Sequence, residues 1–142
     1  STTEPCEEDS CFTSPPAIIL EVVDPATGEN LFSNGTLNFE NIILLDENQK
    51  KVNFQLTSEN NSNLLYLNIG WETGTNLYSL FLGPEVEIPI SLHSERSAGD
   101  CCSFYVLSNF SISNYRFERS ATTGNYRVFV NYNWVFPVIK IY

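Results

Sequence analysis

The sequence predicts an all-β fold, specifically an antiparallel two-sheet β-sandwich of eight or nine strands. Methionine is absent, alanine and lysine are scarce, and Val, Ile, Thr, Tyr, Phe and Asn are plentiful. That composition suits pleated strands and polar turns better than helices. Short segments of alternating apolar and polar residues recur between turn-forming residues, as they do in sandwiches. The 142 residues are enough for one domain with one core.

The first predicted strand, Ala17–Val23, follows the extended pair Pro15–Pro16. Asp24–Gly28 then has proline and glycine where a type I turn followed by a left-handed residue needs them. We therefore expect Gly28 to have a positive φ, and Leu31–Phe32 to pair back onto the first strand.

Two hairpins are predicted in the next part of the chain. Ile42–Leu45 and Val52–Thr57 flank a polar turn, and the second of these alternates strictly between apolar and polar residues. Leu65–Ile69 and Leu77–Leu82 are joined through Glu72–Gly74, which predicts a second hairpin.

The remaining predicted strands are Val86–Leu92, Ser103–Phe117, Tyr126–Trp134 and Val138–Tyr142. Ser103–Phe117 exceeds the usual strand length of about 5 to 6 residues, so we expect a bulge or bend near Ser108–Asn109. In the next strand, alternation places Val128, Val130 and Trp134 on one face, which we interpret as the core face.

The four cysteines are Cys6, Cys11, Cys101 and Cys102. An even cysteine count in a small acidic domain is typical of an oxidising compartment. A Cys101–Cys102 bond would strain the peptide between them, because their Cα atoms are only about 3.8 Å apart. We therefore expect Cys6 and Cys11 each to bond to one of the pair. A four-thiolate zinc site is the alternative, although adjacent cysteines chelate zinc poorly.

These bonds would fasten an acidic N-terminal segment, residues 1–14, to a single sandwich domain, residues 15–142. The net charge is −10, with only seven Lys and Arg residues, which argues against nucleic acid as a partner and against adsorption to anionic membranes. No apolar run approaches the roughly 20 residues that a membrane-spanning helix requires.

Candidate catalytic residues are few, and we expect the chain not to be an enzyme and to need no cofactor. Ser91, His93, Ser94 and Glu95 are of the residue types that hydrolytic triads use, but no nucleophile motif frames them. Glu85 and Glu87 share a strand face, as paired carboxylates of glycosidases do. The flanking Pro84 and Pro89 instead suggest an edge strand whose charges deter aggregation.

Calcium binding is a further possibility left open, because acidic residues fall in several predicted turns. No EF-hand spacing supports a calcium site, and a solvated acidic rim is the simpler interpretation. The residues concerned are Asp24, Glu29, Asp46, Glu47 and Asp100.

Exposed aromatic side chains are the remaining functional signal. If Trp71 or Tyr105 lies exposed beside Asn and Asp residues, it could stack on a sugar ring or serve as a protein hot spot.

The segment from Leu20 to Thr36, an apolar strand followed by Asp-x-x-Thr-Gly and a second strand, resembles the first hairpin of small Bacteroidetes-type lipoproteins. It is also similar to the opening of prealbumin-like and carboxypeptidase-regulatory sandwiches. The resemblance implies an Ig-like or prealbumin-like sandwich at the bacterial outer-membrane surface, anchored through a lipidated cysteine that would precede Ser1. Such lipoproteins often carry an acidic stretch near the anchor, as this chain does.

The leading functional hypothesis is a non-enzymatic, secreted or cell-envelope protein that acts by binding or display, with an extracellular protein or glycan as its partner. A carbohydrate-binding module is the first alternative, distinguished by exposed aromatics that are coplanar or flank a groove. A structural or assembly subunit is the second, in which Val138–Tyr142 would be exchanged with a neighbour.

Overall fold

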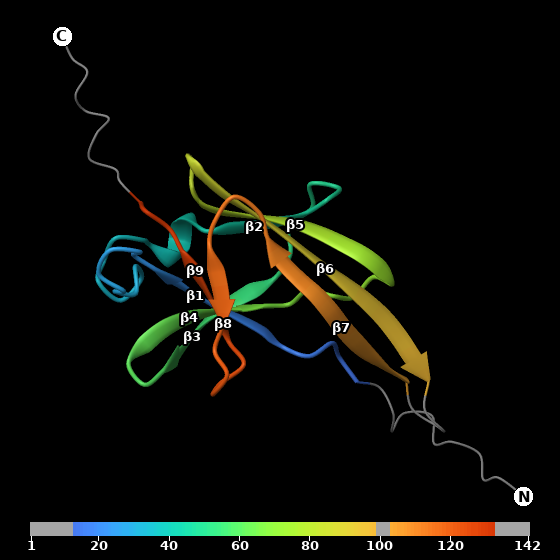
Figure 1. Ribbon diagram of the computed structural model, residues 1–142. Coiled ribbons are helices and arrows are strands. Elements are labelled where there is room, and N and C mark those ends of the chain that lie inside the picture. The colour runs from blue at the N-terminus through green and yellow to red at the C-terminus, as the bar shows by residue number, and fades with distance from the viewer. Residues whose placement is uncertain (1–12, 99–102, 133–142) are drawn as a thin grey trace, which may run out of the picture.

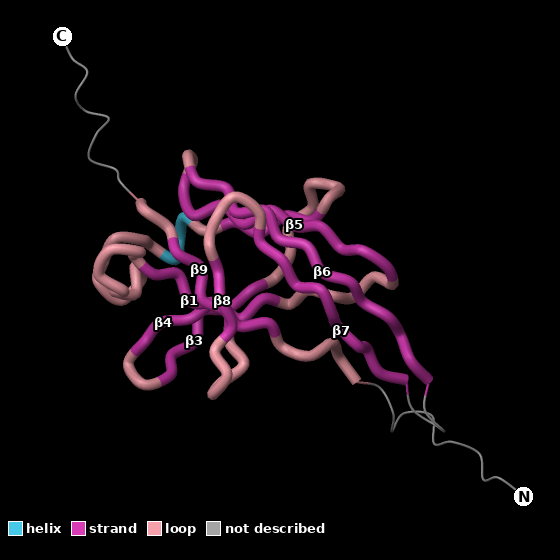
Figure 2. The backbone as a smooth tube through the Cα atoms, in the orientation of Figure 1, coloured by secondary structure: helices cyan, strands magenta, loops and turns pink. Residues whose placement is uncertain are grey.

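The structure, a computed structural model, describes residues 13–98 and 103–132. These residues form nine strands and one short 3-10 helix, Phe39–Asn41, and no α-helix (Figure 2). No helix in the described ranges is long and apolar enough to cross a membrane. The strands are β1 (Ile18–Val23), β2 (Ile43–Asp46), β3 (Phe54–Glu59), β4 (Ser62–Leu67), β5 (Gly74–Gly83), β6 (Val86–Ala98), β7 (Ser103–Ile112), β8 (Phe117–Arg119) and β9 (Tyr126–Phe129).

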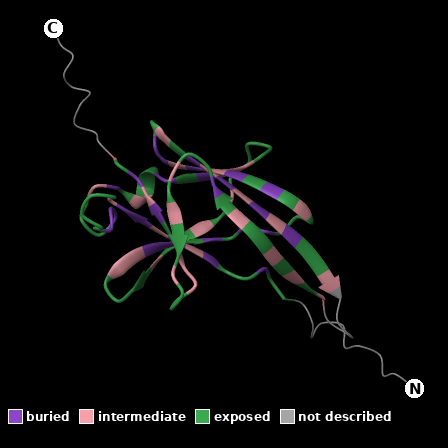
Figure 3. Cartoon of the chain, viewed as in Figure 1, coloured by how far each residue is buried: buried purple, intermediate pink, exposed green. Residues whose placement is uncertain are grey.

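The strands form two open sheets, one of five strands in the order β3-β4-β1-β9-β8 and one of four in the order β2-β5-β6-β7 (Figure 1). Their inner faces share one apolar core, to which the five-stranded sheet contributes Leu20, Leu65 and Val128 and the four-stranded sheet Leu80 and Ile88. Buried and exposed residues alternate along the strands, as Figure 3 shows for β5 and β6. The two-sheet, all-β architecture predicted from the alternation is confirmed.

The five-stranded sheet is mixed, so the prediction of a purely antiparallel sandwich is wrong. β1 and β9 run parallel, with Val22 opposite Val128. The other pairings in both sheets are antiparallel. Alternation shows which residues share a face, but it carries no information about strand direction or partner.

Both hairpins predicted between Ile42 and Leu82 are also wrong. β2 pairs with β5 and β3 pairs with β4, in different sheets. Between β2 and β3 only an isolated bridge, Leu45 to Lys51, and a bond from the Val52 N–H to the Leu44 carbonyl remain. β4 and β5 likewise lie in different sheets. Both connections therefore pass from one sheet to the other.

The turn after β1 forms as predicted. Gly28 has a φ of 78°, and its N–H donates to the Asp24 carbonyl at 2.8 Å. Leu31 and Phe32, however, do not form a strand. Pairing back onto β1 is limited to a bridge between Val23 and Asn30, after which the chain turns.

The predicted bulge lies at Asn109, which has a φ of 55°, and the β6–β7 register shifts at this point. The shift gives β7 one extra residue and exchanges its two faces. Tyr105 and Leu107 are more buried than their neighbours before the bulge, and Phe110 and Ile112 after it. Without the bulge, Phe110 and Ile112 would point to solvent.

Glu87 and Pro89 lie on β6, which is an interior strand, so the predicted edge position is wrong. Pairing of β6 with β7 reaches only as far as Ile90. Pro89 therefore stands one residue beyond that ladder, where its missing N–H costs no ladder bond. The Ser113 N–H donates to its carbonyl at 3.1 Å.

Several predictions concern residues that lie outside the described ranges. They are the pairing of Cys6, Cys11, Cys101 and Cys102, the core position of Trp134 and the terminal strand Val138–Tyr142.

Candidate functional site

Trp71 and Tyr105, the two aromatic residues singled out in the sequence, contact one another. Their ring centroids are 5.7 Å apart at an interplanar angle of 65°, an edge-to-face arrangement. Trp71 follows β4 on the crossing to β5, and Tyr105 lies on β7. Trp71 remains 37% exposed, whereas Tyr105 is half-buried beneath the Arg96 guanidinium, which lies 5.7 Å from its ring.

The backbone before Trp71 is held from both sides at Gly70. The Gly70 N–H donates to Tyr78 Oη at 3.0 Å, and Ser94 Oγ donates to the Gly70 carbonyl at 2.7 Å. A Cβ on Gly70 would lie 2.8 Å from Leu107 Cδ2, and its φ is 96°, so this position requires glycine. Both polar partners are buried, which fixes where the Trp71 side chain starts.

The Trp71 indole and the loop that follows it are held by two asparagines. The indole N–H donates to Asn68 Oδ1 at 2.9 Å. Asn76 is buried, and its Nδ2 donates to the carbonyls of Glu72 at 2.7 Å and Gly74 at 3.0 Å. The aromatic ring is thus preorganised, so a ligand would not need to order it.

Beside Trp71 lies an open hollow of about 400 Å³, where β2 ends and β5 begins. Its polar groups are carboxylates, amides and hydroxyls, and no Lys or Arg lines it. The lining residues are Asp46, Glu47, Asn48, Val52, Asn68, Trp71, Glu72, Thr73, Thr75, Asn76, Leu77 and Tyr78.

Tyr78 reports on the charge of this hollow. Burial raises the pKa of its phenol above the ordinary value, the hydrogen bond from Gly70 opposes the rise, and the negative charges of Asp46, Glu72 and Glu47 add to it. The same phenol donates to Asn76 Oδ1 at 3.0 Å. Three carboxylates therefore act on one hollow, which favours ligands that donate hydrogen bonds or carry positive charge.

The carboxylates do not converge on a metal position. Within residues 13–98 and 103–132, no three His, Cys, Asp or Glu side chains are placed to hold an ion together. Asp46 instead accepts the N–H groups of Asn48 at 2.8 Å and Lys50 at 3.0 Å, closing the turn after β2. Asp100 lies outside the described ranges.

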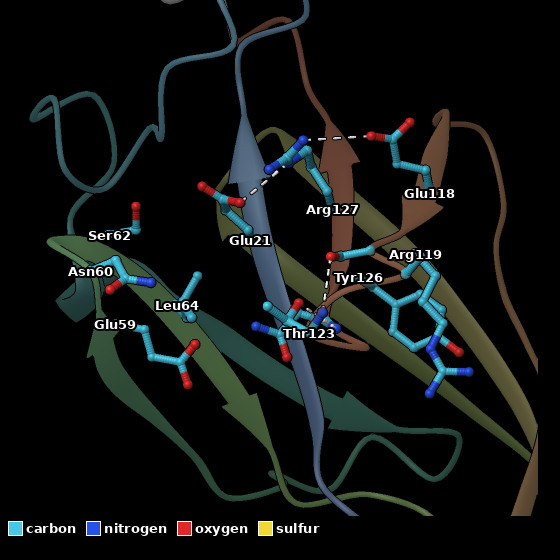
Figure 4. A pocket seen from close by; sticks show the side chains of 13 residues that line it. Glu21, Glu59, Asn60, Ser62, Leu64, Glu118, Arg119, Thr123, Tyr126 and Arg127 are labelled. Carbon is cyan, nitrogen blue, oxygen red and sulfur yellow. Dashed lines mark hydrogen bonds and ion pairs between the residues drawn. The ribbon is translucent and has the colours of Figure 1, made fainter.

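A second concavity, of about 550 Å³, lies across the outer face of the five-stranded sheet (Figure 4). Glu21, Arg127 and Glu118 come from β1, β9 and β8 and occupy one register row. Arg127 Nε lies 3.2 Å from Glu21 Oε1, and its Nη1 lies 3.5 Å from Glu118 Oε2. Asn30 Nδ2 also donates to Glu21 at 3.3 Å.

The charges of that groove largely compensate one another across three strands. Its one aromatic residue, Tyr126, is half-buried and packs on Phe110 with ring centroids 3.9 Å apart. The groove therefore lacks an exposed aromatic face comparable to Trp71. We regard its ion pairs as contacts that join neighbouring strands and the Trp71 hollow as the better binding site.

The residues considered for hydrolysis are not brought together. His93 lies on the outer face of the four-stranded sheet, with its Nε2 3.0 Å from Glu95 Oε2. Ser94 faces inward and is bonded to Gly70. Glu87 accepts a hydrogen bond from Ser79 Oγ at 2.7 Å on the neighbouring strand.

No protein-family model, no curated protein and no solved structure matches this chain significantly. The residues of the site are therefore the basis for inferring a function.

Sequence reasoning missed the residues that build the hollow, namely Asn68, Glu72 and Asn76. A run of polar residues around Gly70–Trp71 is visible in the sequence. In the sequence alone, this run looks like an ordinary surface turn. Its contact with β7, through Trp71 and Tyr105, follows from the connection between the two sheets.

Proposed function

We propose that this chain is a non-enzymatic binding domain that binds a glycan at the Trp71 hollow. The observation that carries the proposal is a half-exposed indole, held at its backbone, its N–H and its ring, beside a hollow lined by hydrogen-bond acceptors. Sugars present C–H faces that stack on aromatic rings and hydroxyls that donate to carboxylates and amide oxygens.

The geometry favours a groove-type site over a flat platform. Trp71 and Tyr105 meet at 65°, so they offer no continuous plane for an insoluble polysaccharide surface. A single indole beside a hollow of about 400 Å³ suits one or two sugar units of a soluble chain. A protein segment bearing Lys or Arg is the competing ligand, because the carboxylates would attract it.

We further propose that the domain works outside the cytosol, as a secreted or cell-envelope protein with an Ig-like or prealbumin-like sandwich. The four cysteines and the acidic composition support an oxidising compartment. A lipid anchor preceding Ser1 at the outer-membrane surface remains part of this proposal. The assembly-subunit alternative, which uses Val138–Tyr142, stays a hypothesis about residues outside the described ranges.

A glycan array with the purified domain tests the proposal. We expect wild type to bind a defined group of glycans and Trp71→Ala to weaken that binding at least about tenfold, because the stacking surface is lost. Tyr66→Ala is the matched control, since Tyr66 is 38% exposed on β4 and does not line the hollow.

Three outcomes would contradict the proposal. The glycan site would be wrong if Trp71→Ala bound as well as wild type, or if no glycan bound while cationic peptides did. Cleavage of a bound glycan, detected by mass spectrometry after long incubation, would contradict the non-enzymatic part.

A further inference from the structure

The edge strand β7 differs from the other sheet edges. In the described part of the chain, β2, β3, β7 and β8 lie at edges. β2 and β8 have four and three residues and carry Asp46, Glu118 and Arg119, and β3 ends in Glu59. β7 has ten residues, none of them charged, proline or glycine.

An unpaired edge strand can form hydrogen bonds with a strand of another molecule. Proteins normally prevent this with short edge strands, charged residues or proline. The chain has 17 acidic residues, yet none lies on its longest edge. On β7 the only feature that would oppose pairing with another strand is the bulge at Asn109.

Beyond that bulge, Ser103–Ser108 is a regular segment with apolar side chains on its outer face. Phe104 is 39% and Val106 is 47% exposed. β5 pairs with β6 only as far as Ser94, so this end of β6 and β7 extends as a two-stranded ribbon (Figure 1). Among the described residues, no strand pairs with its free edge.

We propose that this edge pairs with β7 of a second copy, forming an antiparallel dimer with its two-fold axis at Tyr105. A continuous sheet requires residues that face each other to lie on the same face. With the axis at Tyr105, Phe104 of each copy lies opposite Val106 of the partner subunit. Aromatic and β-branched side chains are a favourable cross-strand pair.

The charge distribution favours a second copy as the occupant. Both central strands of the dimer are uncharged, so no like charges would oppose one another within the joint itself. Among the described residues, the charged residues that pair with this part of β7 are Glu95 and Arg96, which lie on β6, one strand further out. A charged peptide would gain no complementary contact from this edge, whereas an identical strand pairs apolar residues with apolar residues.

The dimer goes beyond the proposed function and does not depend on it. The short segment Ser103–Leu107 from each copy makes a small interface, so we expect weak, concentration-dependent association. Sedimentation of the full chain from about 10 µM to about 1 mM should show monomer passing to dimer. Amide hydrogens of Ser103–Leu107 should gain protection from exchange over the same range.

Val106→Lys should raise the dissociation constant at least about tenfold, because edge lysines oppose strand pairing. Leu77→Lys is the control, since Leu77 is 46% exposed on the same outer face but lies on the interior strand β5. Circular dichroism should show both variants folded.

The register has its own test. Phe104→Glu and Val106→Lys should each dimerise poorly alone, and their mixture should recover dimer, because the carboxylate introduced in one copy would face the ammonium introduced in the other across the axis. A monomer at every concentration would overturn the proposal and leave the edge to another partner or to the chain's own termini. A dimer weakened by Leu77→Lys and not by Val106→Lys would overturn it as well. If the mixture of Phe104→Glu and Val106→Lys did not recover the dimer, the register with the two-fold axis at Tyr105 would be wrong.

Discussion

Single buried polar residues fix the shape of this molecule where its chain crosses between sheets. Asn30, Asn76 and Ser94 are buried, and each is fully used in hydrogen bonds that hold a loop. Asn30 accepts the N–H groups of Phe32 and Ser33 and donates to the carbonyl of Asn63 at 2.8 Å. A buried polar group without such partners would cost about 1 to 3 kcal/mol, so these contacts specify one loop conformation.

The stability of the protein should depend on pH through the phenol of Tyr78. Its raised pKa means that the folded state keeps the phenol neutral at a pH where the unfolded chain ionises. The contribution to stability is therefore fully present below about pH 10, the unfolded value, and is lost as the pH rises through the folded pKa.

Tyr78→Phe should remove this alkaline loss, so its unfolding free energy should fall less steeply than that of wild type above about pH 9. At pH 7 the variant should lose about 1 to 3 kcal/mol, because the Gly70 N–H would be buried without its acceptor. Urea unfolding at several pH values measures both effects. Parallel pH profiles for the two proteins would show that Tyr78 does not titrate as described.

At the scale of the element, the bulge decides which residues of β7 reach the core. The spacing of its more buried apolar residues, Tyr105, Leu107, Phe110 and Ile112, is two, then three, then two. The change in spacing between Leu107 and Phe110 can be seen in the sequence. The length of the predicted strand by itself also indicated a bulge near Asn109. Asn109 suits the position because asparagine tolerates a left-handed backbone better than most residues.

Asn109→Val should destabilise the protein by about 1 to 3 kcal/mol, because a β-branched residue is strained at a φ of 55°. Asn109→Gly is the control and should cost much less, since glycine accepts this backbone and Asn109 is exposed. Denaturant midpoints compare the two. Equal midpoints for Asn109→Val and Asn109→Gly would contradict the prediction, because they would mean that the backbone at the bulge can shift to a conformation that valine accepts without strain.

Local patterns were enough to find most strands, because alternation depends only on near neighbours. Val128 and Val130 were on a predicted core face and are buried. The same patterns could not choose partners for β2 and β3, since either sheet would bury their apolar faces. For the same reason, Trp71 and Tyr105 could be named as aromatic candidates, but their contact could not be foreseen.

In the whole molecule, the parallel pairing of β1 with β9 closes the longest loop among the strand pairings of the described residues. Glu21 and Arg127, which face each other in this pair, are 106 residues apart in sequence. The β3–β4 hairpin, in contrast, turns within two residues at Asn60–Asn61. Closing a long loop costs entropy before its contacts form, so we expect the hairpin early in folding and the β1–β9 pair late.

Val128→Ala and Leu65→Ala test that order, since both side chains are fully buried. Each should lose roughly 2 to 4 kcal/mol of stability. For Val128→Ala the loss should appear mainly as faster unfolding, with the folding rate nearly unchanged, because its contacts form after the transition state. For Leu65→Ala, folding itself should slow. Stopped-flow folding and unfolding rates under non-reducing conditions separate the two cases, and a slowed folding rate in Val128→Ala would place the β1–β9 pair in the nucleus instead.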